Sequence, residues 1–354
     1  MISRKVKANT NNLPFVSVLM PVRNEGAYIE RSLGAVLTQS YPHDRLEVVV
    51  ADGVSSDNTR DLIEKLGANT DIKLVVLDNH KQVTPVGLNL AIEQSIGDIL
   101  ILIGGHTEIE PDYVRNCVRH LEENKAEVVG GPIETIGETL QARSIAASLG
   151  STFGVGGNAF RTVSDRELFV DTVAFGAYKR KVLDRLGMFD EELVRNQDDE
   201  YNYRIREHGG KILLTPDIRS RYYSRSTLLT LWRQYLKYGF YKVRVLQLHP
   251  LQMQMRQFVP LIFVVLLLFS FAVAIFSMVG LVVFAAFLGI YLFANLIASA
   301  KIAAKEEIGF LPLLPIVFFI LHFSYGLGFL SGLAYFANRW GEVPKYKFSP
   351  TNMS

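Results

Sequence analysis

Two short polar segments could bind a ligand, because each places a carboxylate shortly after an apolar run. The first, residues 21–25, reads Pro-Val-Arg-Asn-Glu; the second, residues 52–59, begins with Asp52-Gly53 and continues through small hydroxyl residues and Asp57. A carboxylate followed by glycine and hydroxyl side chains can accept hydrogen bonds from a nucleotide base or a ribose. Asp52 and Asp57 would equally suit a turn and a helix N-cap, which Asp, Ser and Asn commonly form.

The elements that must position these segments alternate along the first 220 residues. Short apolar runs predict strands, and segments with apolar residues at helical spacing predict helices between them. Largely apolar strands separated by helices indicate a mainly parallel sheet covered on both faces, with ligands beyond the carboxyl ends of the strands. The expected strands are 15–20, 46–51, 72–77 and 98–103, and the expected helices are 27–39, 59–66 and 85–95.

The C-terminal part of the chain has the composition of a membrane protein. Residues 258–300 contain no Asp, Glu, Lys or Arg in 43 positions, and residues 308–338 contain none in 31. A helix needs roughly 20 apolar residues to cross a bilayer. The first stretch therefore predicts two crossings with a break at 277–280, and the second predicts one.

The remaining composition indicates where the rest of the chain lies. Residues 1–14 are polar and basic and contain no apolar run that could act as a signal peptide, so we expect the large N-terminal part to stay in the cytoplasm. The single cysteine, Cys117, excludes an internal disulfide and fits a reducing compartment. The net charge of +2 gives no indication of nucleic-acid binding.

The flanking charges leave the number of crossings open. Basic residues in 233–256 favour a cytoplasmic flank before the first apolar stretch. Three crossings would put Arg339, Lys345 and Lys347 outside, against the same tendency. One apolar segment, such as 311–336 with its prolines and a histidine, could instead re-enter the membrane or lie in its interface.

Residues 227–257 form a separate segment that is aromatic, basic and amphipathic. Trp232, Tyr235 and Tyr241 alternate there with basic residues. Such a composition suits a helix in the interface between water and lipid. The alternative is a helix packed on the α/β domain.

The motifs of the chain resemble those of the family 2 glycosyltransferases, which invert the anomeric centre and share the GT-A fold. The likeness starts with VSVLMPVRNEGAYIERSLGAVLTQSYP and EVVVADGVSSDNT, and continues through TPVGLNLAI, GMFDEELVRNQDDEYNYRIREHGGKI and RQYLKYGFYK. It covers essentially the whole soluble part. FGVGGNAFR (153–161) and the stretch 170–200 are similar to the bacterial succinoglycan-type exopolysaccharide glucosyltransferases in particular.

The resemblance assigns roles to the matching residues. Asp198, in NQDDE, occupies the place of the catalytic base, which takes the proton of the acceptor hydroxyl as it attacks in line. Asp199 is the runner-up, and an acidic helix start is the alternative reading of both. The donor nucleotide sugar would contact Pro21, Asn24, Glu25, Asp52, Gly53, Asp57 and Asn89, with Asp52 on the base of the nucleotide.

A third element would lie near the acceptor and the leaving diphosphate. Gln234, Lys237 and Tyr238 match, imperfectly, the Q-x-x-R-W element of the family. Lysine in place of arginine keeps the charge but loses the bidentate fork.

One position departs clearly from the family. After the fourth strand the family places D-x-D or, in this branch, D-G-H, which holds a divalent metal on the diphosphate; this chain has Gly104-Gly105-His106. His106 remains a candidate ligand, which favours Mn²⁺ over Mg²⁺ and predicts weak binding, and it could also be a polar loop residue. Glu108 or Glu110 could compensate for the missing acid. Gly104 could instead be needed for a positive φ.

The resemblance implies a membrane-bound enzyme of cell-surface polysaccharide synthesis at a bacterial-type inner (plasma) membrane. It would transfer a hexose from a nucleotide sugar, UDP-glucose or similar, to a polyprenyl-diphosphate-linked saccharide, in contact with membrane lipid and other polysaccharide-assembly proteins. The alternatives are a noncatalytic sugar-nucleotide-binding or scaffolding partner of an export complex and a processive polysaccharide synthase.

The chain is expected to divide into five parts. A fragment ending near Met255 is expected to fold by itself, because its core would not depend on lipid-facing helices. The expected parts are a polar tail (1–14), a GT-A domain (15–226), an amphipathic interfacial segment (227–257), a transmembrane region (258–338) and a C-terminal tail (339–354).

Overall fold

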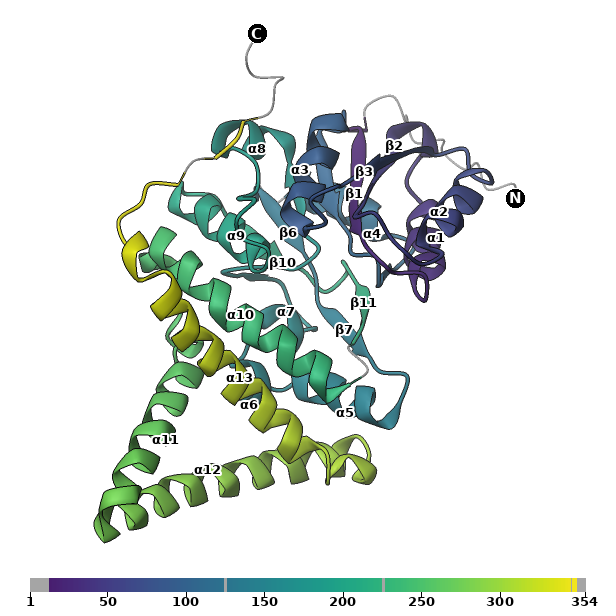
Figure 1. The fold of residues 1–354 in the computed structure, drawn as a ribbon. Coiled ribbons are helices and arrows are strands. Elements are labelled where there is room, and N and C mark those ends of the chain that lie inside the picture. The colour runs from purple at the N-terminus through teal and green to yellow at the C-terminus, as the bar shows by residue number, and fades with distance from the viewer. Residues whose placement is uncertain (1–12, 124–125, 225–226, 345, 349–354) are drawn as a thin grey trace.

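The computed structural model describes residues 13–123, 126–224, 227–344 and 346–348. Its α/β part contains an eight-stranded sheet in the order β3-β2-β1-β4-β9-β6-β10-β8 (Figure 1). The first four strands run parallel to one another, β10 runs parallel to β6, and β9 and β8 are antiparallel to their neighbours, so the expected mainly parallel sheet is confirmed. These strands are β1 (Val16–Val22), β2 (Leu46–Asp52), β3 (Lys73–Asp78), β4 (Ile99–Leu102), β6 (Val128–Gly130), β8 (Leu168–Phe169), β9 (Ala177–Lys179) and β10 (Ile212–Leu214).

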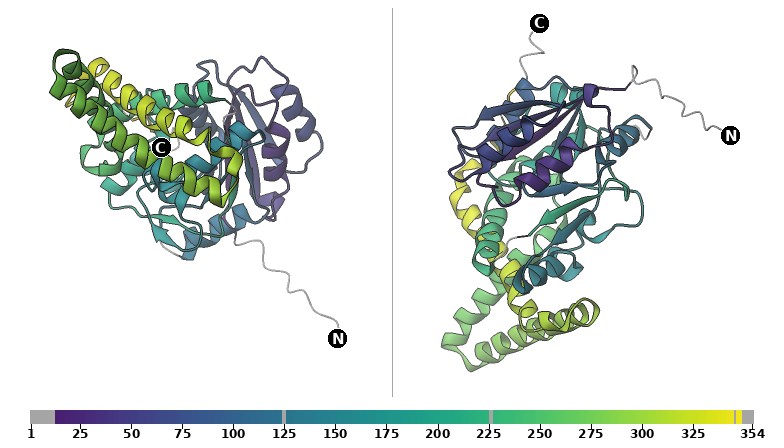
Figure 2. Two further views of the ribbon diagram at one scale, coloured as in Figure 1. Left: turned by 90° about the horizontal axis from the view of Figure 1, so that it is seen from below. Right: turned by 90° about the vertical axis from the view of Figure 1, so that its right-hand side faces the viewer.

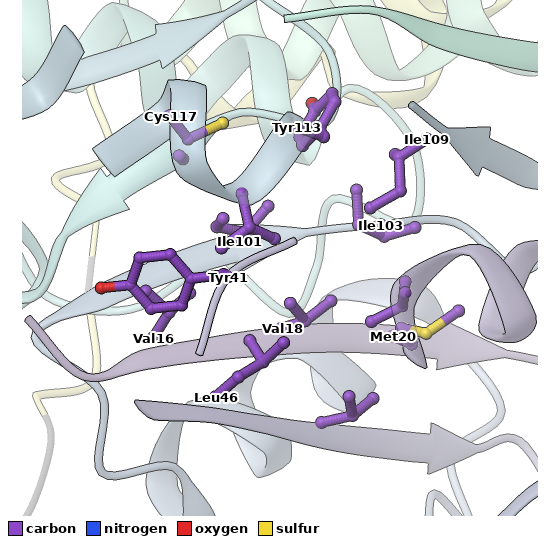
Figure 3. Packing of buried hydrophobic residues seen from close by; sticks show 14 of the residues in the cluster. Val16, Val18, Met20, Tyr41, Leu46, Ile101, Ile103, Ile109, Tyr113 and Cys117 are labelled. Atoms are coloured by element: carbon purple, nitrogen blue, oxygen red, sulfur yellow. The ribbon is translucent and has the colours of Figure 1, made fainter. Parts of the chain in front are cut away.

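Alternate residues of the central strands face two separate apolar cores. On β1, Val16, Val18 and Met20 pack with Tyr113 and Cys117 on one face, as Figure 3 shows, and this core also holds apolar residues of three helices. Leu19 faces the other core. The predicted strands and helices all end within two residues of the observed ones. The first core holds α1 (Ile29–Leu37), α2 (Thr59–Gly67) and α4 (Tyr113–Glu123), and the second holds α3 (Thr84–Gln94), α8 (Arg180–Leu186) and α9 (Gln197–Glu207).

A smaller sheet and three short helices connect this core to the C-terminal helices. In the small sheet β11 lies between β5 and β7, antiparallel to the first and parallel to the second. The elements of this region are β5 (Thr107–Ile109), β7 (Ile133–Ile136), β11 (Ser220–Tyr223), α5 (Leu140–Leu149), α6 (Thr152–Val155) and α7 (Ala159–Thr162).

Four long helices complete the chain: α10 (Leu228–Leu248), α11 (Val259–Phe276), α12 (Met278–Lys305) and α13 (Leu314–Tyr335). The last three are long and apolar enough to cross a membrane. The break predicted at 277–280 is confirmed by the turn at Ser277 between α11 and α12. The apolar window of α13 is 50% buried inside the protein, whereas those of α11 and α12 are 17% and 6% buried, so α13 faces protein far more than its two neighbours do.

The two helices α10 and α13 lie side by side with their backbones in contact (Figures 1 and 2). A Cβ on Gly239 would lie 2.0 Å from the Tyr325 carbonyl oxygen, and one on Gly328 would lie 2.0 Å from that of Leu236, so only glycine permits this approach. The segment 227–257 also packs on the α/β domain, the arrangement that the sequence left as an alternative, because Val245 of α10 shares an apolar cluster with Leu193 and Tyr203. A position of α10 in the lipid interface remains a prediction.

The same packing argues against the expected independence of a fragment ending near Met255, and that expectation stays a prediction. Val317 and Phe318 of α13 share an apolar cluster with Ile145 of α5 and Leu231 of α10. Cutting the chain before α11 would expose that cluster to water.

The segment after α13 returns to the α/β domain. Tyr346 donates a hydrogen bond to Glu200 Oε1 (2.9 Å), and the Lys347 carbonyl accepts one from the Met188 N–H (2.7 Å). The Tyr346 ring also lies against the Arg204 guanidinium, with 3.3 Å from Cζ to the ring centroid. The C-terminal segment is therefore fastened to the helix that carries Asp198.

Candidate active site

A cavity of about 1320 Å³ begins at the carboxyl ends of the central strands and extends along α9 and α10 to α11, α12 and α13. Residues predicted from widely separated motifs meet there. It is lined by Pro21, Asn24, Glu25, Gly53, His106, Asp198, Asp199, Gln234, Lys237 and Tyr238.

Two of the predicted donor residues lie beside this cavity and form local turns. The Asp52 carboxylate accepts hydrogen bonds from the Ser55 N–H (3.3 Å) and hydroxyl (2.6 Å). Asp57 accepts from the Gly26 N–H (3.1 Å) and from the Thr59 hydroxyl (2.5 Å). Both therefore form local turns, as the sequence left open, and a role toward the donor remains a prediction.

Asn89 is also absent from the cavity lining. Its amide exchanges two hydrogen bonds with the backbone of Phe189, at 3.0 Å each, and so holds the loop before α9.

Asn79 was not predicted from the sequence, although it directly follows β3 and lines the cavity. Its Nδ2 donates to the Val83 carbonyl, while its Oδ1 is buried without a described hydrogen-bond partner. A polar residue directly after a strand was the signal that could have identified it.

His106 and Glu25 face each other where the family motif would hold a metal. His106 Nδ1 lies 2.8 Å from Glu25 Oε1. A Cβ on Gly105 would lie 2.6 Å from Glu25 Cγ, so glycine at that position lets Glu25 approach. Gly104 does not have a positive φ, which excludes that explanation for it.

These residues fit a metal ion only in part. Glu108 and Glu110 do not fill the place of the missing acid, because both lie within 4 Å of Arg221. Among the described residues no three His, Cys, Asp or Glu side chains form a metal-binding group. An ion here would have one imidazole and one carboxylate, and the diphosphate of a bound nucleotide would supply its other ligands, as is usual for Mg²⁺.

The two acids at the start of α9 differ in their partners. Asp199 accepts from the Thr172 hydroxyl (3.0 Å) and pairs with the buried Lys242 ammonium (2.5 Å). Asp198 accepts from the backbone N–H of Asp199 (3.0 Å), and no described side chain donates to it. Asp199 is thus held as an ion pair, whereas Asp198 presents its carboxylate to the cavity.

The surroundings of Asp198 change its acidity. Burial, and then the negative charge of Asp199, raise the pKa of Asp198 from its ordinary 3.8 to about 6. Burial lowers the pKa of Lys242, but the Asp199 carboxylate more than offsets this, and the pKa of Lys242 lies above its ordinary value. At neutral pH Asp198 is therefore ionised but is a stronger base than an exposed aspartate, which suits proton abstraction.

Basic and aromatic side chains surround the base. Gln234 donates to the Tyr238 hydroxyl (2.8 Å), and both line the cavity with Lys237. Arg161 and Arg195, which the sequence did not single out, also line it, and neither forms an ion pair with a described residue. Cations without a carboxylate partner make this end of the cavity suitable for phosphate groups.

Comparison with known proteins identifies relatives of this chain. The model of the family described as "Glycosyl transferase family 2" matches residues 17–187. A Methanococcus voltae protein named dolichyl N-acetyl-alpha-D-glucosaminyl phosphate 3-beta-D-2,3-diacetamido-2,3-dideoxy-beta-D-glucuronosyltransferase is 30% identical over 328 residues, which cover 90% of this chain and 97% of that protein.

Two further similarities extend over the whole length. The succinoglycan biosynthesis protein ExoA of Rhizobium meliloti is 27% identical over 324 residues, covering 91% of this chain and 96% of that protein. The solved structure of the mannosyltransferase PcManGT from Pyrobaculum calidifontis, in complex with GDP-Man and Mn²⁺, has a TM-score of 0.59 at 17% identity, with 92% of this chain and 90% of that chain covered. The similarity to PcManGT shows a shared fold.

Proposed function

Because the chain belongs to glycosyl transferase family 2 and is a glycosyltransferase that uses a nucleotide sugar, we propose that it transfers a hexose, with inversion, to a saccharide carried on a polyprenyl phosphate or diphosphate. One observation carries this proposal. The cavity that contains Asp198 joins the carboxyl ends of the central strands to helices long enough to cross a membrane. The donor would be UDP-glucose or a similar nucleotide sugar.

In the proposed reaction Asp198 is the general base. Its carboxylate takes the proton of the acceptor hydroxyl, whose oxygen bonds to the anomeric carbon on the face opposite the leaving group. The bond from that carbon to the diphosphate breaks, and the nucleoside diphosphate leaves with its electron pair. Lys237 would stabilise the charge on the leaving phosphate oxygens as it develops.

Two observations favour this reaction over the alternatives. A noncatalytic binding partner would have no need of a carboxylate with a pKa of about 6 facing the cavity, because keeping such a group ionised costs stability. A processive synthase needs a channel for its polymer, and α13, one of only three described helices that could span a membrane, packs on the α/β domain instead.

Transfer assays in lipid nanodiscs test the proposal. The protein is incubated with a panel of labelled UDP- and GDP-hexoses and polyprenyl phosphate- or diphosphate-linked saccharides. Label should enter the lipid fraction with at least one pair. Donor hydrolysis without transfer throughout the panel would contradict it.

We propose that His106 and Glu25 hold a divalent ion weakly, with Mn²⁺ preferred to Mg²⁺ because one ligand is an imidazole. Bound together with the nucleotide, the ion would neutralise diphosphate charge. Calorimetric titration of Mn²⁺ in the presence of UDP should show binding that His106→Ala weakens. Gly104→Asp should tighten it, because the φ of Gly104 tolerates a side chain, although its Cβ would lie 3.1 Å from Thr107 Oγ1. Equal affinity in wild type and His106→Ala would exclude His106 as a ligand.

We propose an even number of complete crossings, with the α/β domain and the C-terminal segment both in the cytoplasm. Glu342, beyond α13, pairs with Arg244 of α10 (2.8 Å), so both lie on one side of the membrane. In this arrangement α11 and α12 cross as a hairpin, while α13 rests on α10, consistent with one apolar segment that does not cross.

Cysteine labelling tests this topology, because the native Cys117 is buried. Val343, 83% exposed, lies beyond α13, and Val279, 73% exposed, lies at the turn of the hairpin. In intact cells an impermeant thiol reagent should label Val279→Cys and leave Val343→Cys unlabelled. Labelling of Val343→Cys without permeabilisation would show that the chain crosses an odd number of times.

A further inference from the structure

The cavity changes character beyond Asp198. Its far wall is formed by α6 and the turn after it, with residues of α11, α12 and α13. This apolar end contrasts with the polar donor end, and it begins beside the base, because Lys242, the ion-pair partner of Asp199, lines the cavity together with Tyr325. Its apolar and aromatic side chains include Val155, Val259, Phe263, Tyr291, Leu321 and Tyr325.

The apolar end opens at the surface of a candidate membrane helix. Val259, in the first turn of α11, lines the cavity and yet is 61% exposed. Ile262 and Leu266 on the same helix are 50% and 46% exposed. Figure 2 shows α11 and α12 projecting away from the α/β domain, so this surface would face lipid.

Polar groups suited to phosphate also line the cavity. Arg161 lines the cavity without an ion pair to any described residue, and Arg195 approaches from the start of α9. Asn158 also lines the cavity, and its side-chain N–H can donate to a phosphate oxygen. Arg161 and Asn158 belong to the motif FGVGGNAFR, which the donor site does not use.

The size of the cavity also calls for a second ligand. Its volume of about 1320 Å³ exceeds the roughly 1,000 Å³ at the upper end for small-molecule pockets. A lipid-linked acceptor must bring a sugar hydroxyl to Asp198 while its hydrocarbon chain stays in the membrane. A route that is polar at the base and apolar at α11 satisfies both requirements.

Resting on the proposed function, we infer that the apolar end is the binding site for the polyprenyl chain of the acceptor. The first isoprene units lie among Val155, Phe263 and Leu321, and the chain enters the bilayer past Val259. The phosphate lies at Arg161 and Arg195.

A matched pair of substitutions on α11 tests this site. Val259→Trp fills the opening, whereas Ile262→Trp adds the same side chain one turn away at a residue that does not line the cavity. Each variant is assayed with the same saccharide diphosphate on a long polyprenyl chain and on a short alkyl chain. The readout is the ratio of kcat/KM for the long acceptor to that for the short one.

Val259→Trp should lower this ratio at least about tenfold, because overfilling a packed apolar site costs on the order of the 1.4 kcal/mol that a tenfold change represents. Ile262→Trp should keep the wild-type ratio. An unchanged ratio in Val259→Trp, or an equal fall in both variants, would overturn the assignment. If the wild type transfers sugar to neither acceptor, the proposed function is refuted instead.

Discussion

Asp198→Asn should reduce sugar transfer by at least about 100-fold, the lower end for loss of a general base. Donor binding should stay near wild type, because asparagine keeps the shape and removes only the charge. The wild-type rate should fall below pH 6, as protonation removes the base at its pKa of about 6. Single-turnover transfer rates as a function of pH, together with nucleotide titrations, measure both effects.

Asp199→Asn is the matched control, since it alters the neighbouring carboxylate, and it also removes the ion-pair partner of Lys242. The charge of Asp199 raises the pKa of Asp198, so its removal should move the acid limb of the rate profile to lower pH while transfer persists. If Asp199→Asn instead loses transfer by about 100-fold or more while Asp198→Asn stays active, Asp199 is the base.

Asp198→Asn should also stabilise the protein at neutral pH. The folded chain holds the Asp198 proton more tightly than the unfolded chain, so stability falls as pH rises from 3.8 to about 6. That pKa difference corresponds to about 3 kcal/mol at most. Asp198→Asn should therefore unfold at a higher temperature than wild type at pH 7 and lose this advantage near pH 4.

Lys242→Met should destabilise the fold by about 3–5 kcal/mol, because it leaves the Asp199 carboxylate without its ion-pair partner. Lys242 is 3% exposed and joins α10 to α9 through this pair. The uncompensated charge should also raise the pKa of Asp198, so the acid limb of the transfer rate should move above pH 6. Urea unfolding and pH–rate profiles measure the two effects.

The double variant Lys242→Met with Asp199→Asn separates the pair from simple packing. With both charges removed, most of the lost stability should return, since replacing a whole buried pair is often nearly neutral. A double variant as unstable as Lys242→Met alone would show that the lysine acts through its packing and not through Asp199.

The α/β domain could be predicted from the sequence because its signals are local. Runs such as 46–51 and 98–103 are apolar, β-rich and bounded by turn residues, and they became β2 and β4. The position of Asp198 was predictable as well, because the acids of NQDDE stand at the start of a helix. Which acid is held by Lys242 was not, since the lysine lies 43 positions further along the chain.

The arrangement of the C-terminal helices could not be predicted in the same way. Hydropathy identifies an apolar helix but does not tell whether lipid or protein covers it, so α13 resembled α11 and α12. Gly328 and Gly332 indicated a close contact between helices, because small residues four apart commonly let helices approach closely. Asp52 and Asp57 were ambiguous for a different reason, since ligand binding and turn formation call for the same side chains.

The most direct test of the account is the anomeric configuration of the product. Wild-type protein in nanodiscs is given UDP-α-D-glucose, or the nucleotide hexose that the panel identifies, with a polyprenyl-linked saccharide, and the new linkage is determined by NMR spectroscopy. Inversion with Asp198 as the base should give a β-linked sugar on the lipid-linked acceptor, formed by the wild type and nearly absent with Asp198→Asn. An α-linked product, or a β-linked product formed equally well by Asp198→Asn, would contradict it.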